Sequence, residues 1–173
     1  MGMIQAPDQT SADRLDQLVQ LYEKDLLRIC CLYLRDRSAA EDVVQDAFLK
    51  TYRNMVSFRG ESSEKTWLIR IALNCCRDYR RSAWYRYIDR RVSVDRLPLS
   101  SDPPSDEHLA LTLAVMKLKP KYLEVVLLYF YEGCPVKEIA KMLNITEAAV
   151  SVRLRKAKEQ LKGELERGEG DEE

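Results

Sequence analysis

The sequence lacks most features that mark membrane, secreted and strand-rich proteins. Its 173 residues include only six Gly and six Pro, too few for the many tight turns of a typical β fold. The longest strongly apolar stretch, residues 125–131, is far shorter than the roughly 20 residues that span a bilayer. No basic start followed by an apolar run opens the chain, so we expect no secretory signal. These absences predict a cytoplasmic protein without membrane insertion.

The five cysteines and one histidine match no metal or disulfide pattern. Residues 30–31 and 75–76 are adjacent Cys pairs, Cys134 stands apart, and no C-x-x-C pair occurs. An odd number of cysteines does not suit a closed disulfide framework. His108 alone cannot form a His-rich metal site. We expect reduced thiols in the core, and neither a metal nor a cofactor.

Apolar residues recur with a 3.6-residue period through most of the chain, which predicts an all-α fold. The segments with this period cover residues 13–34, 38–55, 63–82, 106–118, 121–132, 136–143 and 146–162. Ser38 and Glu41 match a capping box at the start of the second helix. Pro120 suits the first turn of a later helix, and Gly133 suits the end of that helix.

Residues 94–105 interrupt the helical pattern and divide it into two small helical domains. This segment holds three of the six prolines and three serines, and it shows no periodicity. We predict a first domain at residues 10–92, a flexible linker at 93–105, a second domain at 106–163 and an acidic tail at 164–173.

The net charge of zero hides an uneven distribution of charges. Residues 70–96 carry eight Arg and three Asp, and residues 151–162 have a net charge of +4. Residues 164–173 have a net charge of −5. Two separate basic segments indicate two local contacts with a polyanion. A solvated helix face is the alternative for either segment taken alone.

The last two helices form the strongest local motif. A short turn at Asn144 and Ile145 joins them, and Thr146 caps the second, which predicts a helix-turn-helix with its second helix in the major groove. The side opposite the apolar face of that helix carries small residues followed by charged ones, namely Ala148, Ser151, Val152, Arg155, Lys156 and Glu159. Arg155 can fork onto a guanine, and Lys156 can contact a phosphate. An ordinary helical hairpin is the alternative.

The third helix carries a second basic face. Its predicted core side holds Leu68, Ile71, Ala72, Cys75 and Tyr79. Its predicted outward side holds a stripe at i, i+4, i+7 and i+11, formed by Arg70, Asn74, Arg77 and Arg81, with Thr66 and Leu73 beside it. An Asn among arginines can hydrogen-bond the edge of an unstacked base. A solvated face is the alternative.

The second helix differs from the third in its chemistry. Its outward side presents Asp42, Gln45, Asp46 and Leu49, followed by Arg53. Acids repel DNA, so this side suits a protein partner with basic residues, and Leu49 adds an apolar contact. An acidic solvated face is an equal alternative.

Three segments resemble regions of bacterial sigma factors. Residues 40–60 (AEDVVQDAFLKTYRNMVSFRG) resemble the core-binding segment of region two. Residues 66–81 (TWLIRIALNCCRDYRR) resemble the promoter-melting and minus-ten recognition helix of the same domain. Residues 118–162 (LKPKYLEVVLLYFYEGCPVKEIAKMLNITEAAVSVRLRKAKEQLK) are similar to region four, which binds the minus-thirty-five element. Two domains and a short linker match the extracytoplasmic-function (ECF) group, over roughly residues 13–162.

The resemblance implies a role for each face. Asp42, Gln45 and Asp46 fall where sigma factors grip the clamp helices of the polymerase β′ subunit. Asn74 falls where these factors hold a flipped base of the melted non-template strand. The duplex-reading positions of region four correspond to Ser151, Val152, Arg155 and Lys156. The resemblance also implies an anti-sigma factor as a partner.

Two departures from relatives affect promoter preference. Glu64 and Lys65 stand where many relatives carry an aromatic residue of the flipped-base pocket. Ser151 and Val152 replace an Arg-Ser pair that is common in relatives. The promoter sequences that relatives prefer therefore do not transfer to this chain.

Taken together, the sequence predicts a sigma factor without catalysis of its own, bound to core RNA polymerase and promoter DNA. The alternative is an autonomous helix-turn-helix regulator that binds duplex DNA as a dimer. That alternative leaves the Asp42 side and the Asn74 stripe unexplained. A small helical enzyme is a third alternative, but the sequence shows no nucleophile–base pair and no metal cluster.

Overall fold

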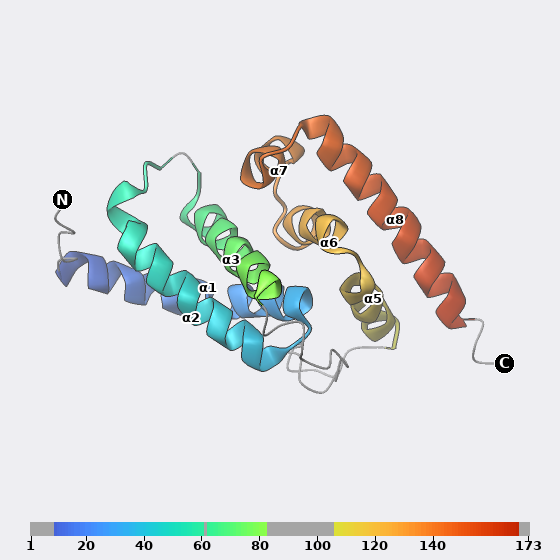
Figure 1. The fold of residues 1–173 in the computed structure, drawn as a ribbon, viewed down its shortest axis with the longest axis horizontal. Coiled ribbons are helices and arrows are strands. Elements are labelled where there is room, and N and C mark those ends of the chain that lie inside the picture. Colours follow the sequence, from blue (N-terminus) through green and yellow to red (C-terminus); the bar gives the residue numbers. More distant parts are fainter. Residues whose placement is uncertain (1–8, 61, 83–105, 170–173) are drawn as a thin grey trace. The chain divides into compact units, whose positions relative to one another are not determined.

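The computed structural model describes residues 9–60, 62–82 and 106–169. Every regular element within these residues is helical, which confirms the predicted all-α fold (Figure 1). The chain divides into two compact units, residues 1–98 and 99–173. The predicted linker at residues 93–105 lies outside the described residues.

The first unit is built from three helices. These are α1 (Gln9–Leu34), α2 (Arg37–Asn54) and α3 (Glu64–Arg81), with a short 3-10 turn (Met55–Ser57) after α2. Each of the three helices packs against the other two. Ala40, Ala47 and Ala72 are fully buried, and such small side chains allow helices to pack closely.

The cysteines lie in the core, as predicted. All five are free and buried, and Cys30 Sγ of α1 lies 3.6 Å from Cys76 Sγ of α3. Burial raises the pKa of Cys31 to about 12. Burial also raises the pKa of Cys75 to about 11, although a hydrogen bond from Lys50 acts in the opposite direction. These two thiols therefore stay protonated at neutral pH and act as small apolar residues.

The start of α2 differs from the prediction. Asp36 is the N-cap, and its Oδ1 accepts a hydrogen bond from the Ala39 amide at 2.9 Å. The predicted capping box of Ser38 and Glu41 is wrong, because Ser38 lies inside the helix and Glu41 pairs with Arg37 at 2.8 Å. The chain turns at the preceding Arg35, which has a φ of 59°. This turn precedes the extended backbone that Asp36 needs as a cap.

The buried side of α3 is also wider than predicted. Ser63 caps the helix, with its Oγ accepting from the Thr66 amide at 3.1 Å. Thr66 and Leu73 are buried, so their predicted place beside the outward stripe is wrong. Ile71 and Tyr79, predicted in the core, are only half-buried. Thr66 and Leu73 are covered because α3 packs against two helices, α1 and α2, and the resulting buried side is turned away from Ile71 and Tyr79.

The second unit contains α5 (Asp106–Lys117), α6 (Pro120–Val126), α7 (Val136–Leu143) and α8 (Glu147–Glu169). A π-helical segment (Leu127–Tyr131) continues α6. Pro120 opens α6 and Gly133, with a φ of +66°, follows the π segment, as predicted. Helix α8 packs against α5, α6 and α7.

Helix α8 continues into the acidic segment of the sequence. Residues 164–169 are helical, and Lys117 of α5 donates to Glu164 at 2.9 Å. This hydrogen bond is the main cause that lowers the pKa of Glu164. The beginning of the predicted acidic tail is therefore attached to the second unit by an ion pair.

The cap of α2 provides a test of this fold. Asp36→Ala should lower the free energy of unfolding by about 1 kcal/mol, because the Ala39 amide loses its acceptor. Urea denaturation of the full chain, followed by circular dichroism, measures this change. Ser38→Ala is the matched control and should change stability little, since Ser38 is exposed and does not cap the helix. Equal destabilisation by both substitutions would contradict the assignment of the cap.

Candidate functional site

A tight turn between α7 and α8 forms the helix-turn-helix. Asn144 ends α7 in the left-handed conformation, with φ 53° and ψ 50°. The Ile145 amide donates to the Ala140 carbonyl at 3.0 Å, which satisfies an end carbonyl of α7. Thr146 Oγ1 accepts from the Ala149 amide at 3.1 Å at the start of α8. The predicted motif is confirmed.

One side of α8 is open to solvent. Val150, Leu154 and Ala157 are buried against the rest of the unit. All five residues predicted to contact duplex DNA are exposed, namely Ala148, Ser151, Val152, Arg155 and Lys156. The Ser151 hydroxyl donates to the Glu147 carbonyl at 3.1 Å, so it is engaged within the helix. Small side chains therefore stand near the N-terminal end of this surface, and bases follow one turn later.

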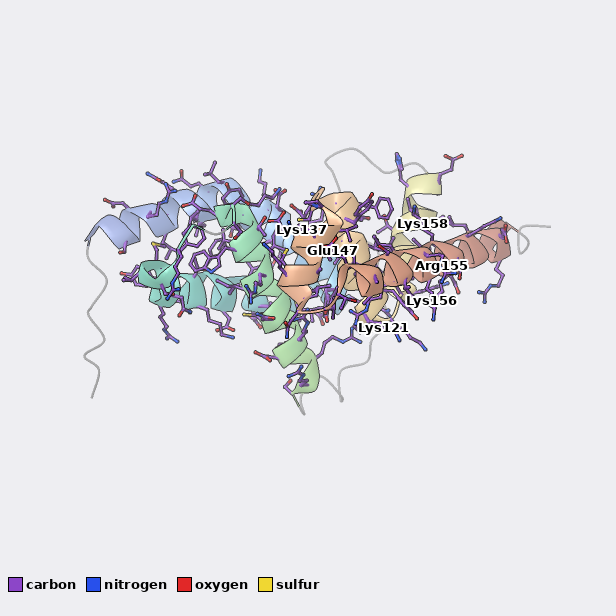
Figure 2. The ribbon with its side chains drawn as sticks, turned by 90° about the horizontal axis from the view of Figure 1, so that it is seen from above. Lys121, Lys137, Glu147, Arg155, Lys156 and Lys158 are labelled. Atoms are coloured by element: carbon purple, nitrogen blue, oxygen red, sulfur yellow. The ribbon has the colours of Figure 1, made fainter. Side chains whose placement is uncertain are left out.

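Further charged residues lie on α8 and α7 of the same unit. Arg155 Nη1 lies 3.8 Å from Glu159 Oε1 on the next turn. Figure 2 shows Lys156 and Lys158 projecting from different sides of α8, and Lys137 of α7 in the same unit. Lys158 Nζ lies 5.4 Å from the centroid of the Phe130 ring. Lys137 lies on α7 and Lys158 lies outside the predicted outward arc of α8, so the sequence pattern identified neither as a candidate.

The Arg–Asn stripe of α3 also lies at the surface. Arg70, Asn74 and Arg81 are exposed, and Arg77 is half-buried. Arg77 Nη1 donates to Asn74 Oδ1 at 2.8 Å. This bond uses the amide oxygen of Asn74, while hydrogen bonds to a base can also come from the donors of the amide nitrogen. The structure thus brings the four predicted residues onto one face and adds a contact between two of them.

The start of α3 is attached to α1 by two ion pairs. Arg14 Nε donates to Glu64 Oε1 at 3.1 Å, and Lys65 Nζ lies 2.9 Å from Asp25 Oδ2. Glu64 and Lys65 therefore attach the first turn of α3 to α1.

An aromatic contact joins the segment before α3 to the first turn of that helix. The Phe58 ring lies 4.7 Å from the Trp67 ring, centroid to centroid. Sequence spacing does not predict this contact, because the two residues lie nine positions apart on either side of a loop. Both side chains are half-buried.

The outward side of α2 presents acids and one apolar residue. Asp42, Gln45 and Asp46 are exposed, and Leu49 is 53% exposed. Lys50 Nζ lies 2.9 Å from Asp46 Oδ2, and this hydrogen bond is the main cause that raises the pKa of Lys50. The charge of Asp46 is therefore partly balanced. Within the described ranges, no ion pair involves Asp42.

A groove of about 670 Å³ adjoins this side of α2. Gln45 and Leu49 belong both to the groove and to the acidic side. Its remaining lining is mostly apolar with charged residues among it, namely Leu15, Val19, Glu23, Lys24, Leu27, Arg37, Glu41, Val44 and Phe48. Leu15 and Val19 fall within the helix predicted at residues 13–34, but the helical period does not show that they border an open groove.

Among the described residues, no group of three or more His, Cys, Asp or Glu side chains could hold a metal ion. No helix in the same ranges is both long and apolar enough to cross a membrane.

The chain matches two regions of one protein family. Residues 18–86 match Sigma-70 region 2, and residues 108–161 match Sigma-70 region 4. The first match contains α2 and α3 with their exposed faces, and the second contains the helix-turn-helix. Fold, site and both matches define a DNA-binding transcription initiation factor.

Two similar proteins indicate which group of sigma factors the chain resembles. It is 29% identical over 167 residues to the ECF RNA polymerase sigma factor SigW of Bacillus subtilis, covering 88% of this chain and 89% of SigW. It is 29% identical over 158 residues to the probable RNA polymerase sigma factor RfaY of Xanthomonas campestris. That match covers 86% of this chain but only 40% of RfaY. The chain belongs to the ECF sigma factors.

A solved structure has the same fold. The sigma factor RpoE from Bartonella quintana, crystallised with the anti-sigma factor NepR, superposes with a TM-score of 0.73 at 20% sequence identity. The match covers 89% of this chain and 98% of that one.

Proposed function

We propose that this ECF sigma factor binds core RNA polymerase and directs it to promoters through two separate DNA contacts. The observation that carries the proposal is the chemistry of the faces in the two matched regions. Region two exposes an acidic side on α2 and an Arg–Asn stripe on α3, and region four exposes small and basic residues on α8. Polymerase supplies the metal and the chemistry, so the chain needs neither catalytic residues nor a cofactor.

The acidic side of α2 contacts the β′ clamp helices in this proposal. Asp42 is the charge best available to a basic partner, because Asp46 already pairs with Lys50. Leu49 and the adjoining groove offer apolar surface beside the charge. A mixed apolar and charged surface of this kind suits a protein and would repel a DNA backbone.

The stripe on α3 binds the melted minus-ten strand. Arg70 and Arg81 flank Asn74 along the helix and can hold phosphates, while the Asn74 amide can pair with the edge of an unstacked base. Helix α8 lies in the major groove of the minus-thirty-five duplex, where Arg155 contacts a base and Lys156 a phosphate. The predicted linker at residues 93–105 sets the distance between these contacts.

An anti-sigma factor controls the chain in this proposal, as the complex of RpoE with NepR supports. The site of action is the cytoplasm, where core polymerase and promoter DNA are found. The alternative of an autonomous duplex-binding regulator is less suitable, because it assigns no use to Asp42 or Asn74.

Reversing one charge tests the polymerase contact. Asp42→Lys should weaken binding to core polymerase by about tenfold or more, because a base would then face basic residues of the partner. Titration of labelled full-length chain with purified core enzyme measures the affinity. Glu166→Lys is the matched control, since it makes the same charge change at an exposed position of α8. Wild-type affinity for the Asp42 variant would contradict this interface.

Removing the Asn74 amide tests base capture. Asn74→Ala should leave the fold, the binding to core polymerase and closed-complex formation unchanged, because Asn74 is exposed and lies outside the hydrophobic core. The free energy of promoter opening should become less favourable by roughly 1–3 kcal/mol, which corresponds to the loss of one base contact. Permanganate footprinting on linear and premelted templates measures opening. A premelted template should not restore the loss if Asn74 holds the base, and unchanged opening on linear DNA would refute the role.

Two neighbouring substitutions on α8 separate base reading from phosphate binding. Arg155→Ala should cost about 1–3 kcal/mol in specific binding and relax the preference at one base pair. Lys156→Ala should weaken binding to all sequences and reduce its salt dependence. Both effects are measured with the holoenzyme on promoter duplexes that carry single upstream base changes. Wild-type behaviour of both variants would show that α8 does not read the duplex.

A further inference from the structure

Glu159 is an acid about one turn beyond Arg155, at the C-terminal end of the α8 surface that we assign to duplex DNA. It follows the fully buried Val150 by nine residues, or about two and a half helical turns. This spacing places it on the side opposite the core, and its side chain is 63% exposed. A carboxylate repels phosphates because both groups are negatively charged, so its presence on a surface that binds DNA requires an explanation.

The contact of Glu159 with Arg155 contributes little to the stability of the fold. The two side chains are 67% and 63% exposed, and their nearest charged atoms are 3.8 Å apart. Exposed ion pairs contribute little to stability. Arg precedes Glu by four residues, which is also the less favourable order along a helix. Helix stability therefore gives no sufficient reason for an acid at this position.

We propose that Glu159 is a positioning residue that raises the sequence specificity of α8 through Arg155. This inference rests on the proposed function, in which Arg155 contacts a base in the duplex. The carboxylate balances part of the guanidinium charge and repels phosphate oxygens near it. Contacts between Arg155 and the DNA backbone are weakened, whatever the base sequence.

A contact with guanine is affected much less. Guanine presents its O6 and N7 acceptors on the floor of the major groove, away from the phosphates. Arg155 has five N–H donors, so it can bind these two acceptors and keep its contact with Glu159. Glu159 therefore weakens binding to unrelated DNA more than binding to a site with the correct guanine, and the ratio of the two affinities rises.

The test uses full-length chain with core polymerase and two probes. One probe is the duplex that the wild type selects from a pool with a randomised upstream segment, and the other is an alternating A·T duplex without guanine. Glu159→Gln should tighten binding to the A·T duplex by about three- to tenfold and steepen its salt dependence by about one phosphate contact. Binding to the selected duplex should change less. An unchanged ratio of the two affinities would overturn the inference.

Two controls separate a local effect from a general one. Glu166→Gln makes the same charge change about two turns further along α8, where Glu166 pairs with Lys162 at 3.7 Å. It should leave the ratio unchanged, and an effect equal to that of Glu159→Gln would overturn the inference. In an Arg155→Ala background, Glu159→Gln should no longer alter the ratio, because its effect acts through Arg155. A persistent effect there would also overturn it.

Failure of the proposed function gives a different result from failure of this inference. If the wild type selects no common upstream sequence from the pool, the proposed function fails, and the role of Glu159 fails with it. If the wild type selects a sequence and Glu159→Gln keeps the wild-type ratio, only the inference about Glu159 fails.

Discussion

The close packing of α3 against α1 and α2 is the constraint on which the first unit depends. The buried residues of these helices include small ones, such as Cys30 and Cys76 with their sulfur atoms 3.6 Å apart, and large ones, such as Leu26, Leu68 and Leu73. Because each helix turns its apolar side inward, the acids of α2 and the arginines of α3 remain on separate outward sides. Lys50 lies between them, pairing with Asp46 and donating to Cys75. One small bundle can therefore present both the acidic side that we propose for protein binding and the basic side that we propose for DNA binding.

In the second unit, local backbone geometry at the turn between α7 and α8 sets the direction of α8. The left-handed Asn144 ends α7, and Thr146 starts α8 two residues later. Buried residues of α8 hold it against α5, α6 and α7, which leaves its opposite side open along several turns. The whole chain has a net charge of zero, which agrees with DNA contacts that are confined to local basic faces. A uniformly basic surface would instead bind DNA without polymerase.

The sequence predicted helices, the helix-turn-helix and the exposed residues of α2 and α8, because a 3.6-residue period records which side of a helix is buried. It failed where burial depends on several partners at once. Thr66 and Leu73 were placed outward, since a single stripe was assumed and α3 is covered from two sides. The predicted cap was Ser38 and the observed cap is Asp36, because the turn at Arg35 is not visible in residue types. The contacts of Arg77 with Asn74 and of Arg155 with Glu159 depend on side-chain conformations that spacing alone leaves open.

Run-off transcription over genomic fragments, with core polymerase in the presence and absence of this chain, tests the central claim most directly. The account predicts discrete start sites that appear only when the chain is added, and that share one element near minus ten and one near minus thirty-five. No chain-dependent start sites, together with tight binding of the chain alone to duplex DNA, would contradict it and favour an autonomous regulator.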